Sequence, residues 1–224
     1  MSDLLLIRRL LPPLMVCALL AGCGGIEPTP YRDIASAPYL RPDPADDTGR
    51  FPYRYATPVD WQAYSRVIID PVAIYYGADS QFGDMDEKDK VELADYMQAQ
   101  FRERLATRFQ ITGTPTPGTL RIHLILTGAT TTPAVIGPFS HFDLAGGLYN
   151  GVQAIRGREG MISGAVVYAV EIHDAASGKL LSAYITKQYP GAMNIGASFG
   201  SLGAAKTGID KGADALVEQL RPGA

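Results

Sequence analysis

The chain has 224 residues, of which 46% are hydrophobic and 19% are charged, and its formal net charge is −3. This length suits one domain of ordinary size, and recurring runs of aliphatic and aromatic residues exclude full disorder. An acidic balance lacks the basic surface on which nucleic-acid binding depends, so we expect no nucleic-acid partner. The 24 glycines and 16 prolines exceed average usage and indicate a chain rich in loops.

The first residues have the pattern of a bacterial export signal. Two arginines precede an apolar run over residues 10–20, which is too short to cross about 30 Å of hydrocarbon as a transmembrane helix. The run ends in the letters LAGC at residues 20–23, which resemble the lipobox of bacterial lipoproteins. This resemblance implies that residues 1–22 are a signal peptide and that the sulfur of Cys23 carries a diacylglycerol.

Lipidation of Cys23 has consequences for chemistry and for location. The only other cysteine, Cys17, would leave with the signal peptide, so the mature chain would have no disulfide, thiol nucleophile or cysteine metal site. Fatty chains of the palmitate type would anchor the protein without insertion of the polypeptide. Gly24 stands where lipoproteins retained in the inner membrane show aspartate, which favours the outer membrane, with the protein on its periplasmic side.

A proline-rich stretch follows the cysteine. Residues 24–60 contain seven prolines and no sustained periodicity, so we predict that residues 23–60 are a lipidated cysteine and an extended tether. The aromatic residues of this stretch are too frequent for a pure spacer. We therefore expect its latter part, from about Tyr39, to lie across the surface of a periplasmic domain formed by residues 61–221.

The first half of that domain contains two predicted strands and a helix. Residues 66–76 are rich in β-branched and aromatic side chains, and Pro71 places this strand at an edge or a bulge. Residues 84–87 have the spacing of a capping box, and apolar residues from Val91 onward recur at helical intervals, which predicts a helix over 87–108. Apolar and polar residues alternate over 120–127, so the even positions of this strand should face the core.

The second half predicts a hairpin and a final helix. Residues 133–164 have no clean period and are expected to be a long excursion. Residues 164–174 and 180–188 form the clearest hairpin, and a helical face with three glycines extends from Leu202 to Leu220. The fold class predicted from this order is a two-layer α+β domain. It has two main helices on one face of a mostly antiparallel sheet of four to five strands.

Two stretches carry motifs that a known family shares. Residues 65–72 read SRVIIDPV, and residues 163–183 read SGAVVYAVEIHDAASGKLLSA. They resemble the bacterial lipoprotein family known as domain of unknown function 3313, whose members have a DPV strand and an acidic hairpin behind a lipobox. The resemblance covers about residues 39–220 and implies a location and a fold, but no activity. Val167 and Ala169 depart from it, because an acidic residue is expected ahead of Glu171.

The histidines and acids show no catalytic or metal-binding pattern. His123, His141 and His173 lack the spacings of metal ligands, so we expect no metal and no cofactor. The strand alternation places His123 and His173 opposite the core, where they should be exposed to solvent. Ser140, His141 and Asp143 are neighbours on one loop and cannot converge as a triad. Asp174 precedes the letters AASG and is expected to cap a turn.

The excursion offers the best candidate surface for a partner or a ligand. It gathers apolar and aromatic side chains among glycines, a composition suited to a lid, a partner groove or a lipid-facing patch. An alternative is that it folds back and covers the sheet. The side chains selected for this surface are Phe139, His141, Phe142, Leu148 and Tyr149.

Three hypotheses of function follow. The first is a non-enzymatic lipoprotein that binds or scaffolds another component of the cell envelope, with the lipid concentrating it at the membrane. The second is a periplasmic carrier or sensor of an apolar ligand beneath residues 134–152. The third is an enzyme that uses Asp70, His141 or Glu171, which would have to share one cleft. We expect no enzymatic activity, and the oligomeric state stays open.

Overall fold

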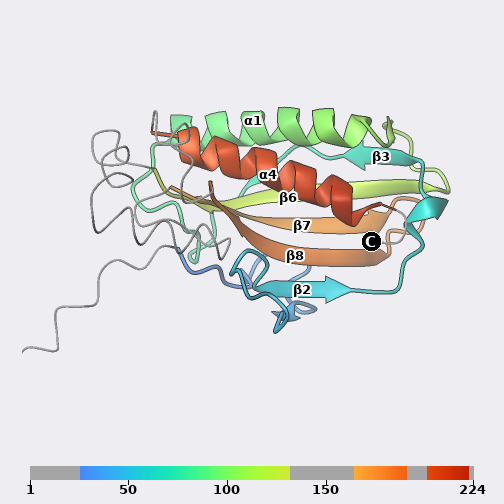
Figure 1. Cartoon of the computed structure of the whole chain (residues 1–224), viewed down its shortest axis with the longest axis horizontal. Helices are drawn as coiled ribbons and strands as arrows, with labels where there is room; N and C mark the ends of the chain where they lie inside the picture. The colour runs from blue at the N-terminus through green and yellow to red at the C-terminus, as the bar shows by residue number, and fades with distance from the viewer. Residues whose placement is uncertain (1–25, 132–163, 191–200, 222–224) are drawn as a thin grey trace, which may run out of the picture.

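The computed structural model describes residues 26–131, 164–190 and 201–221. Within these ranges an eight-stranded sheet carries two α-helices on one face (Figure 1). In chain order the elements are β1 (Arg41–Pro42), β2 (Tyr53–Ala56), a 3-10 turn (Trp61–Ala63), β3 (Arg66–Ile69), β4 (Ala73–Ile74), α1 (Glu87–Ala106), β5 (Gln110–Ile111), β6 (Thr119–Ala129), β7 (Val166–Asp174), β8 (Leu180–Gln188) and α4 (Gly203–Gln219).

The predicted α+β class with both helices on one face is confirmed, but the predicted sheet of four to five mostly antiparallel strands is wrong. The strand order is β1-β2-β8-β7-β6-β3-β5, and β4 also pairs with β6. The strands β3, β4 and β5 are parallel to their neighbours. The chain leaves β3, passes through α1 and returns as β6, and such a crossover makes the two strands parallel.

The main core lies between the helices and the sheet. The even-numbered side chains of β6 face it, as the alternation predicted, and all four between 120 and 126 are at most 1% exposed. In α1, Leu93 is fully buried, whereas Val91, which the helical spacing placed in the core, is 44% exposed. No side-chain hydrogen bond caps the first turn of α1 at Asp86, so the predicted capping box does not form.

The two helices run side by side in the same direction (Figure 1). Polar contacts join them in matching order: Lys206 Nζ lies 2.7 Å from Glu92 Oε1, and Arg104 Nε lies 2.8 Å from Asp214 Oδ1. Between these pairs the Tyr96 hydroxyl donates to Asp210 at 3.0 Å. None of the helices in the described ranges has the length and apolar content that a membrane span requires.

The proline-rich residues expected to form a tether lie against the second face of the sheet. Tyr31, Ile34 and Leu40 are at most 5% exposed and form a second apolar cluster with side chains of β7 and β8. β2 continues the sheet beyond β8 in antiparallel pairing. Aromatic and aliphatic side chains spaced along this segment bury enough apolar surface to hold it down despite its prolines.

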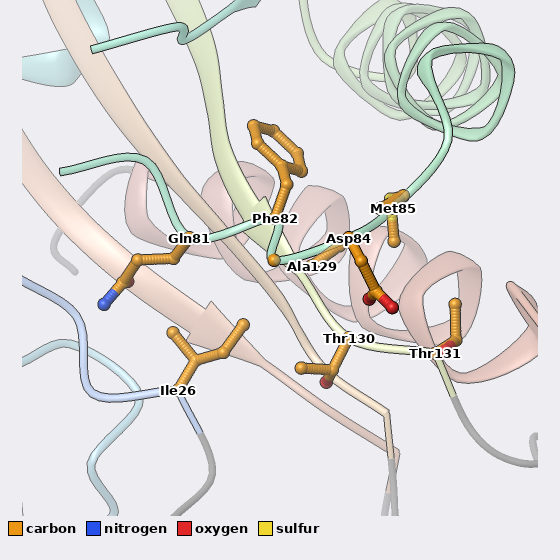
Figure 2. Close-up of a pocket in the computed structure, with 9 residues that line it drawn as sticks. Ile26, Gln81, Phe82, Asp84, Met85, Ala129, Thr130 and Thr131 are labelled. Carbon is orange, nitrogen blue, oxygen red and sulfur yellow. The ribbon is translucent and has the colours of Figure 1, made fainter. Parts of the chain in front are cut away.

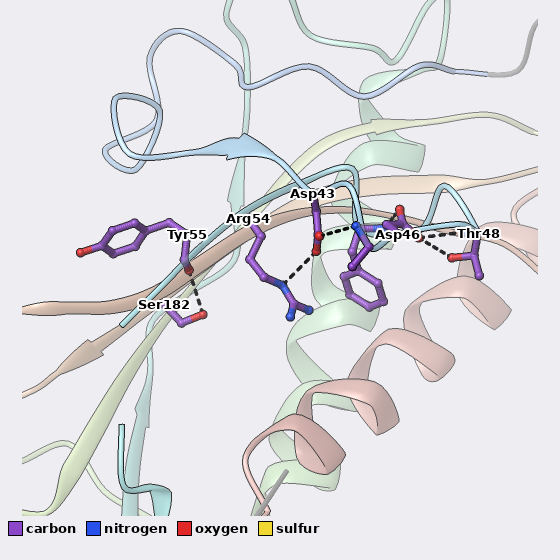
Figure 3. A network of polar contacts seen from close by, with 8 residues as sticks. Asp43, Asp46, Thr48, Arg54, Tyr55 and Ser182 are labelled. Atoms are coloured by element: carbon purple, nitrogen blue, oxygen red, sulfur yellow. Dashed lines mark hydrogen bonds and ion pairs between the residues drawn. The ribbon is translucent and has the colours of Figure 1, made fainter. Parts of the chain in front are cut away.

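Polar contacts also hold the connection between β1 and β2 (Figure 3). The carboxylate of Asp46 accepts hydrogen bonds from the Thr48 hydroxyl at 2.7 Å and the Phe51 amide at 2.7 Å. Asp43 forms an ion pair with Arg54 at 3.7 Å, and the Ser182 hydroxyl of β8 donates to the Tyr55 carbonyl at 3.2 Å. Apolar and polar contacts together therefore make this segment part of the folded domain.

Candidate functional site

Four polar side chains gather on the second face of the sheet because of the register between β6 and β7. Arg121 is opposite His173, and His123 is opposite Glu171. Residues directly opposite in an antiparallel pair point to the same face, so all four lie together on the face away from the helices. The alternation of β6 thus produces both the core face and this polar group.

Asp70 joins the group from the end of β3. Its carboxylate accepts hydrogen bonds from Arg121 Nε at 2.8 Å and from Arg121 Nη2 at 2.9 Å. Its Oδ2 also lies 3.1 Å from His123 Nε2. This two-point contact between a guanidinium and a carboxylate fixes the side chain of Asp70 where β3 ends before Pro71.

Glu171 joins the group to the N-terminal segment. Its Oε1 accepts a hydrogen bond from the Ser36 amide at 2.7 Å, and its Oε2 lies 3.7 Å from His173 Nε2. The rings of His123 and His173 meet edge to face with centroids 5.0 Å apart. Ion-pair, ring and hydrogen-bond contacts therefore connect Asp70 through the two histidines and Glu171 to Ser36.

The environment shifts the pKa values of these groups in opposite directions. Burial lowers the pKa of His123 despite the nearby Asp70 carboxylate. The Glu171 carboxylate raises the pKa of His173. Burial acts to raise the pKa of Glu171, but the nearby His173 imidazole and the hydrogen bond from the Ser36 amide outweigh it and hold that pKa below its ordinary value. The Arg121 guanidinium lowers the pKa of Asp70.

The raised pKa of His173 predicts a contribution to stability that disappears in mild base. The folded protein holds this proton more tightly than the unfolded chain, so the contribution is fully present below about pH 6.5. It is lost as the pH rises through the raised pKa. Urea unfolding of the wild type and His173→Gln between pH 5 and 9 should show their difference in unfolding free energy shrinking as the pH rises.

His123 provides a control in which the pH dependence of the unfolding free energy should have the opposite sign. Its pKa is lowered, so the difference between the wild type and His123→Gln should move in favour of the wild type as the pH rises through about 6.5. A difference between the wild type and His173→Gln that does not change with pH would contradict the assignment of the raised pKa to the pair with Glu171.

A pocket of about 360 Å³ opens at the end of the sheet where β6 ends (Figure 2). Its volume lies at the lower end of the range of about 300–1,000 Å³ for small-molecule sites. Apolar and polar side chains both line it, from the first described residue, from the loop before α1 and from the end of β6. The lining residues are Ile26, Gln81, Phe82, Gly83, Asp84, Met85, Ala129, Thr130 and Thr131.

Gln81 connects the pocket to the N-terminal segment. Its Oε1 accepts a hydrogen bond from the Tyr31 hydroxyl at 2.6 Å, and its Nε2 donates to the Glu27 carbonyl at 2.7 Å. One wall of the pocket is thus fixed by residues close to the start of the described chain. Such a pocket could hold a small apolar group with a polar end.

Several residues selected from the sequence lie outside the described residues, so the structure leaves their roles untested. These are Cys23, Phe139, His141, Phe142, Leu148 and Tyr149. Asp70 and Glu171 belong to the same series of contacts, but they are not in the pocket. The predicted turn role of Asp174 is confirmed, because its Oδ1 accepts hydrogen bonds from the Ser177 amide at 2.8 Å and hydroxyl at 2.6 Å.

The two strand histidines are less exposed than the alternation predicted. The side chain of His123 is 39% exposed, but that of His173 is only 19% exposed. The Glu171 carboxylate and the Gly178 carbonyl, 3.3 Å from His173 Nδ1, enclose the latter ring. No group of three or more histidine, cysteine or acidic residues in the described ranges is placed to bind a metal ion.

Sequence reasoning missed the histidine pair and the pocket. Pairing of the strand at 120–127 with the strand at 164–174 would have placed His123 opposite Glu171, but the register between them cannot be read from either strand alone. The pocket brings together residues from three separate segments, which have no shared sequence pattern.

Comparisons with known proteins identify the family of this chain. Among solved structures, the chain is similar to the PelC dodecamer from Paraburkholderia phytofirmans, with 9% identity, a TM-score of 0.37 and coverage of 72% of this chain and 94% of that one. It is also similar to a putative neuraminyllactose-binding hemagglutinin homolog from Helicobacter pylori, with 9% identity, a TM-score of 0.33 and coverage of 74% and 86%. No curated protein matches the chain. The family described as "Protein of unknown function (DUF3313)" matches residues 30–216, and the chain belongs to this family.

Proposed function

We propose that the protein is a non-enzymatic lipoprotein of the outer membrane whose periplasmic domain binds or scaffolds another envelope component. The observation that carries this proposal is the attachment of the N-terminal segment to the sheet. The described residues begin at Ile26, three residues after Cys23, and the Glu27 carbonyl already accepts a hydrogen bond from Gln81. A lipid on Cys23 would therefore hold a rigid domain at the membrane surface rather than a domain on a long spacer.

The polar groups of the second face support a binding role over catalysis. Glu171 accepts a hydrogen bond from the Ser36 amide and lies 3.7 Å from the His173 imidazole, and Asp70 accepts a hydrogen bond from the Arg121 guanidinium. These contacts position backbone and strands, which is a structural use of acids and histidines. A protein with an anchor, a rigid domain and acids used in this way is suited to hold a partner near the membrane.

Photocrosslinking in intact cells tests this proposal. A benzophenone amino acid at Tyr39, whose side chain is 52% exposed, should give a discrete crosslinked species of higher mass. The Cys23→Ser variant carrying the same probe should lose most of that species, because it would no longer be concentrated at the membrane. Crosslinking of the chain to itself alone, or to nothing, would contradict a heterologous partner.

The lipid anchor itself needs a separate measurement. Radiolabelled palmitate should enter the wild-type chain and not Cys23→Ser, and globomycin should block maturation of the precursor. Wild-type protein that takes up no palmitate would remove the lipoprotein part of the proposal.

The pocket favours a second candidate function, that of a carrier or sensor of an apolar ligand. The pocket reaches Thr131, three residues before the range 134–152 proposed to cover such a ligand. Native mass spectrometry of protein purified from membranes should then detect a bound lipid-like molecule. Met85→Glu, within the pocket, should lose this molecule, and Ala176→Glu, in the exposed turn between β7 and β8, should retain it. A wild-type spectrum without a ligand would exclude this candidate.

A further inference from the structure

One end of the domain is defined by the strand register. Ala129 of β6 pairs with Val166 of β7, which in turn pairs with Gln188 of β8, so these three residues lie level across the sheet. The pocket opens at this level, with Ile26 and Ala129 in its wall (Figure 2). We name this region the anchor end. The opposite end carries the turn between β7 and β8, since Asp174 pairs with Leu120 near the start of β6.

The chain reaches the anchor end very soon after Cys23. Three residues span at most about 11 Å even when fully extended. The chain is fastened to the domain from this point, because Gln81 donates to the Glu27 carbonyl at 2.7 Å and the Arg32 amide donates to Asp79 at 3.1 Å. A lipid on Cys23 would therefore be attached to a residue whose Cα lies about 11 Å or less from that of Ile26 at the anchor end.

The surface beside the pocket has the composition of a membrane interface. Tyr76 is 64% exposed and Val91 is 44% exposed, which makes them two of the three exposed large hydrophobic residues in the described ranges. The Lys90 side chain is only 18% exposed, and its ammonium lies 3.4 Å from Glu87 Oε2 and 5.9 Å from the centroid of the Tyr76 ring, so it supports Tyr76 from beneath. Tyrosine, with an apolar ring and a polar hydroxyl, is typical of the level of lipid headgroups.

Contacts place this surface at the anchor end. The Tyr76 hydroxyl donates to Glu87, the first residue of α1, which is two residues after the pocket residue Met85. Val91 follows Glu87 by four residues and so lies on the same side of the helix. Asp84 and Glu87 also lie at the anchor end, so attraction between charged side chains and lipid headgroups does not orient the domain on its own. The short connection to Cys23 orients it.

We propose that the anchor end lies against the headgroup layer of the bilayer that holds the Cys23 lipid, with the exposed side chains of Tyr76 and Val91 in contact with lipid. This inference rests on the lipid anchor of the proposed function. The pocket then opens toward the membrane. The turn between β7 and β8 points away from it, because the 11 residues of β6 separate the two ends by about 36 Å. That far turn and the second face are the surfaces left for an envelope partner.

Depth-dependent fluorescence quenching tests the orientation. The only cysteine of the mature chain would be alkylated, so an introduced cysteine can be labelled selectively. Lys88→Cys at the anchor end and Ala176→Cys in the far turn are matched sites, since both residues are exposed. Full-length lipidated protein would be placed in phosphatidylethanolamine and phosphatidylglycerol vesicles containing a lipid with a nitroxide on its headgroup. We expect quenching at residue 88 to be several-fold greater than at residue 176.

Mass spectrometry of the same samples shows whether Cys23 carries lipid, and so distinguishes a failure of the proposed orientation from a failure of the lipid anchor. A lipidated chain with equal quenching at both sites, or with stronger quenching at residue 176, would overturn the orientation and leave the lipoprotein assignment intact. A mature chain without lipid on Cys23 would overturn the proposed function and this inference with it. In a lipidated chain, Tyr76→Ser with Val91→Ser should lower quenching at residue 88, and unchanged quenching would refute the contact surface.

Discussion

Replacement of Gly208 or Gly212 with alanine is expected to lower the free energy of unfolding by about 1–3 kcal/mol. Alanine favours an exposed helix over glycine by about 1 kcal/mol, so the expected sign is the reverse of the intrinsic preference. A Cβ at Gly208 would lie 2.7 Å from the Gln188 carbonyl oxygen and 3.0 Å from Val166 Cγ1. A Cβ at Gly212 would overlap the Tyr168 hydroxyl. Urea unfolding of each variant measures the loss.

The overlap at Gly212 can be relieved by a second substitution. The Tyr168 side chain is fully buried, and within the described residues its hydroxyl has no hydrogen-bond partner. Tyr168→Phe should therefore change stability little on its own, and in combination with Gly212→Ala it should recover part of the loss. A double-mutant cycle gives this coupling, which should be absent between Tyr168→Phe and Gly208→Ala.

Gly113→Ala provides the control for these glycine variants. A Cβ at Gly113 has no atom within 4 Å, so this variant should be as stable as the wild type within about 0.5 kcal/mol. If Gly208→Ala and Gly212→Ala also matched the wild type, the close approach of α4 to β7 and β8 would be wrong.

Sequence periodicity predicted the long elements of the fold and missed the short ones. The periodic pattern found the long elements, including α1, β6 and the hairpin of β7 and β8, because each contains enough residues to repeat its period several times. The two-residue strands β1, β4 and β5 have no period to detect. Their places in the sheet depend on neighbours that are distant in the sequence.

The parallel pairing could have been anticipated from the order of elements. A strand, a helix and a second strand predict a crossover, and β3, α1 and β6 form one. The end of strand pairing before Pro71 could also have been anticipated from the sequence, because proline has no amide hydrogen to donate. The pairing of β3 does end before this residue. Composition was less informative for residues 26–60, because prolines are interspersed there with apolar residues that are buried against the domain, such as Tyr31, Ile34 and Leu40.

The polar site was only half predictable. The alternation of β6 correctly placed His123 on the face away from the core. The last contact in the series that starts at Asp70 is the hydrogen bond from the Ser36 amide to Glu171, and Ser36 is 135 residues before Glu171 in the chain. A backbone amide as partner leaves no signal in the side-chain pattern, so only the folded arrangement shows that this glutamate holds the N-terminal segment.

Glu171→Leu is expected to lower the free energy of unfolding by about 3–5 kcal/mol, because removal of one member of a buried polar pair leaves its partners unsatisfied. Glu171 is 3% exposed, and its loss would leave the Ser36 amide without its acceptor and His173 without its counter-charge. Urea unfolding gives the magnitude. Limited proteolysis should show earlier cleavage within residues 26–56, since this bond holds the segment against β7.

Two further variants separate the hydrogen bond from the charge. Glu171→Gln retains an oxygen for the Ser36 amide but loses the ion pair with His173, so it should cost less than Glu171→Leu and should abolish the raised pKa of His173. Glu218→Leu is the matched surface control, because that carboxylate is 65% exposed in an ion pair with Arg221 and such pairs contribute at most about 1 kcal/mol. Equal stability of Glu171→Leu and Glu218→Leu, with unchanged cleavage of residues 26–56, would show that the segment is held by its apolar contacts alone.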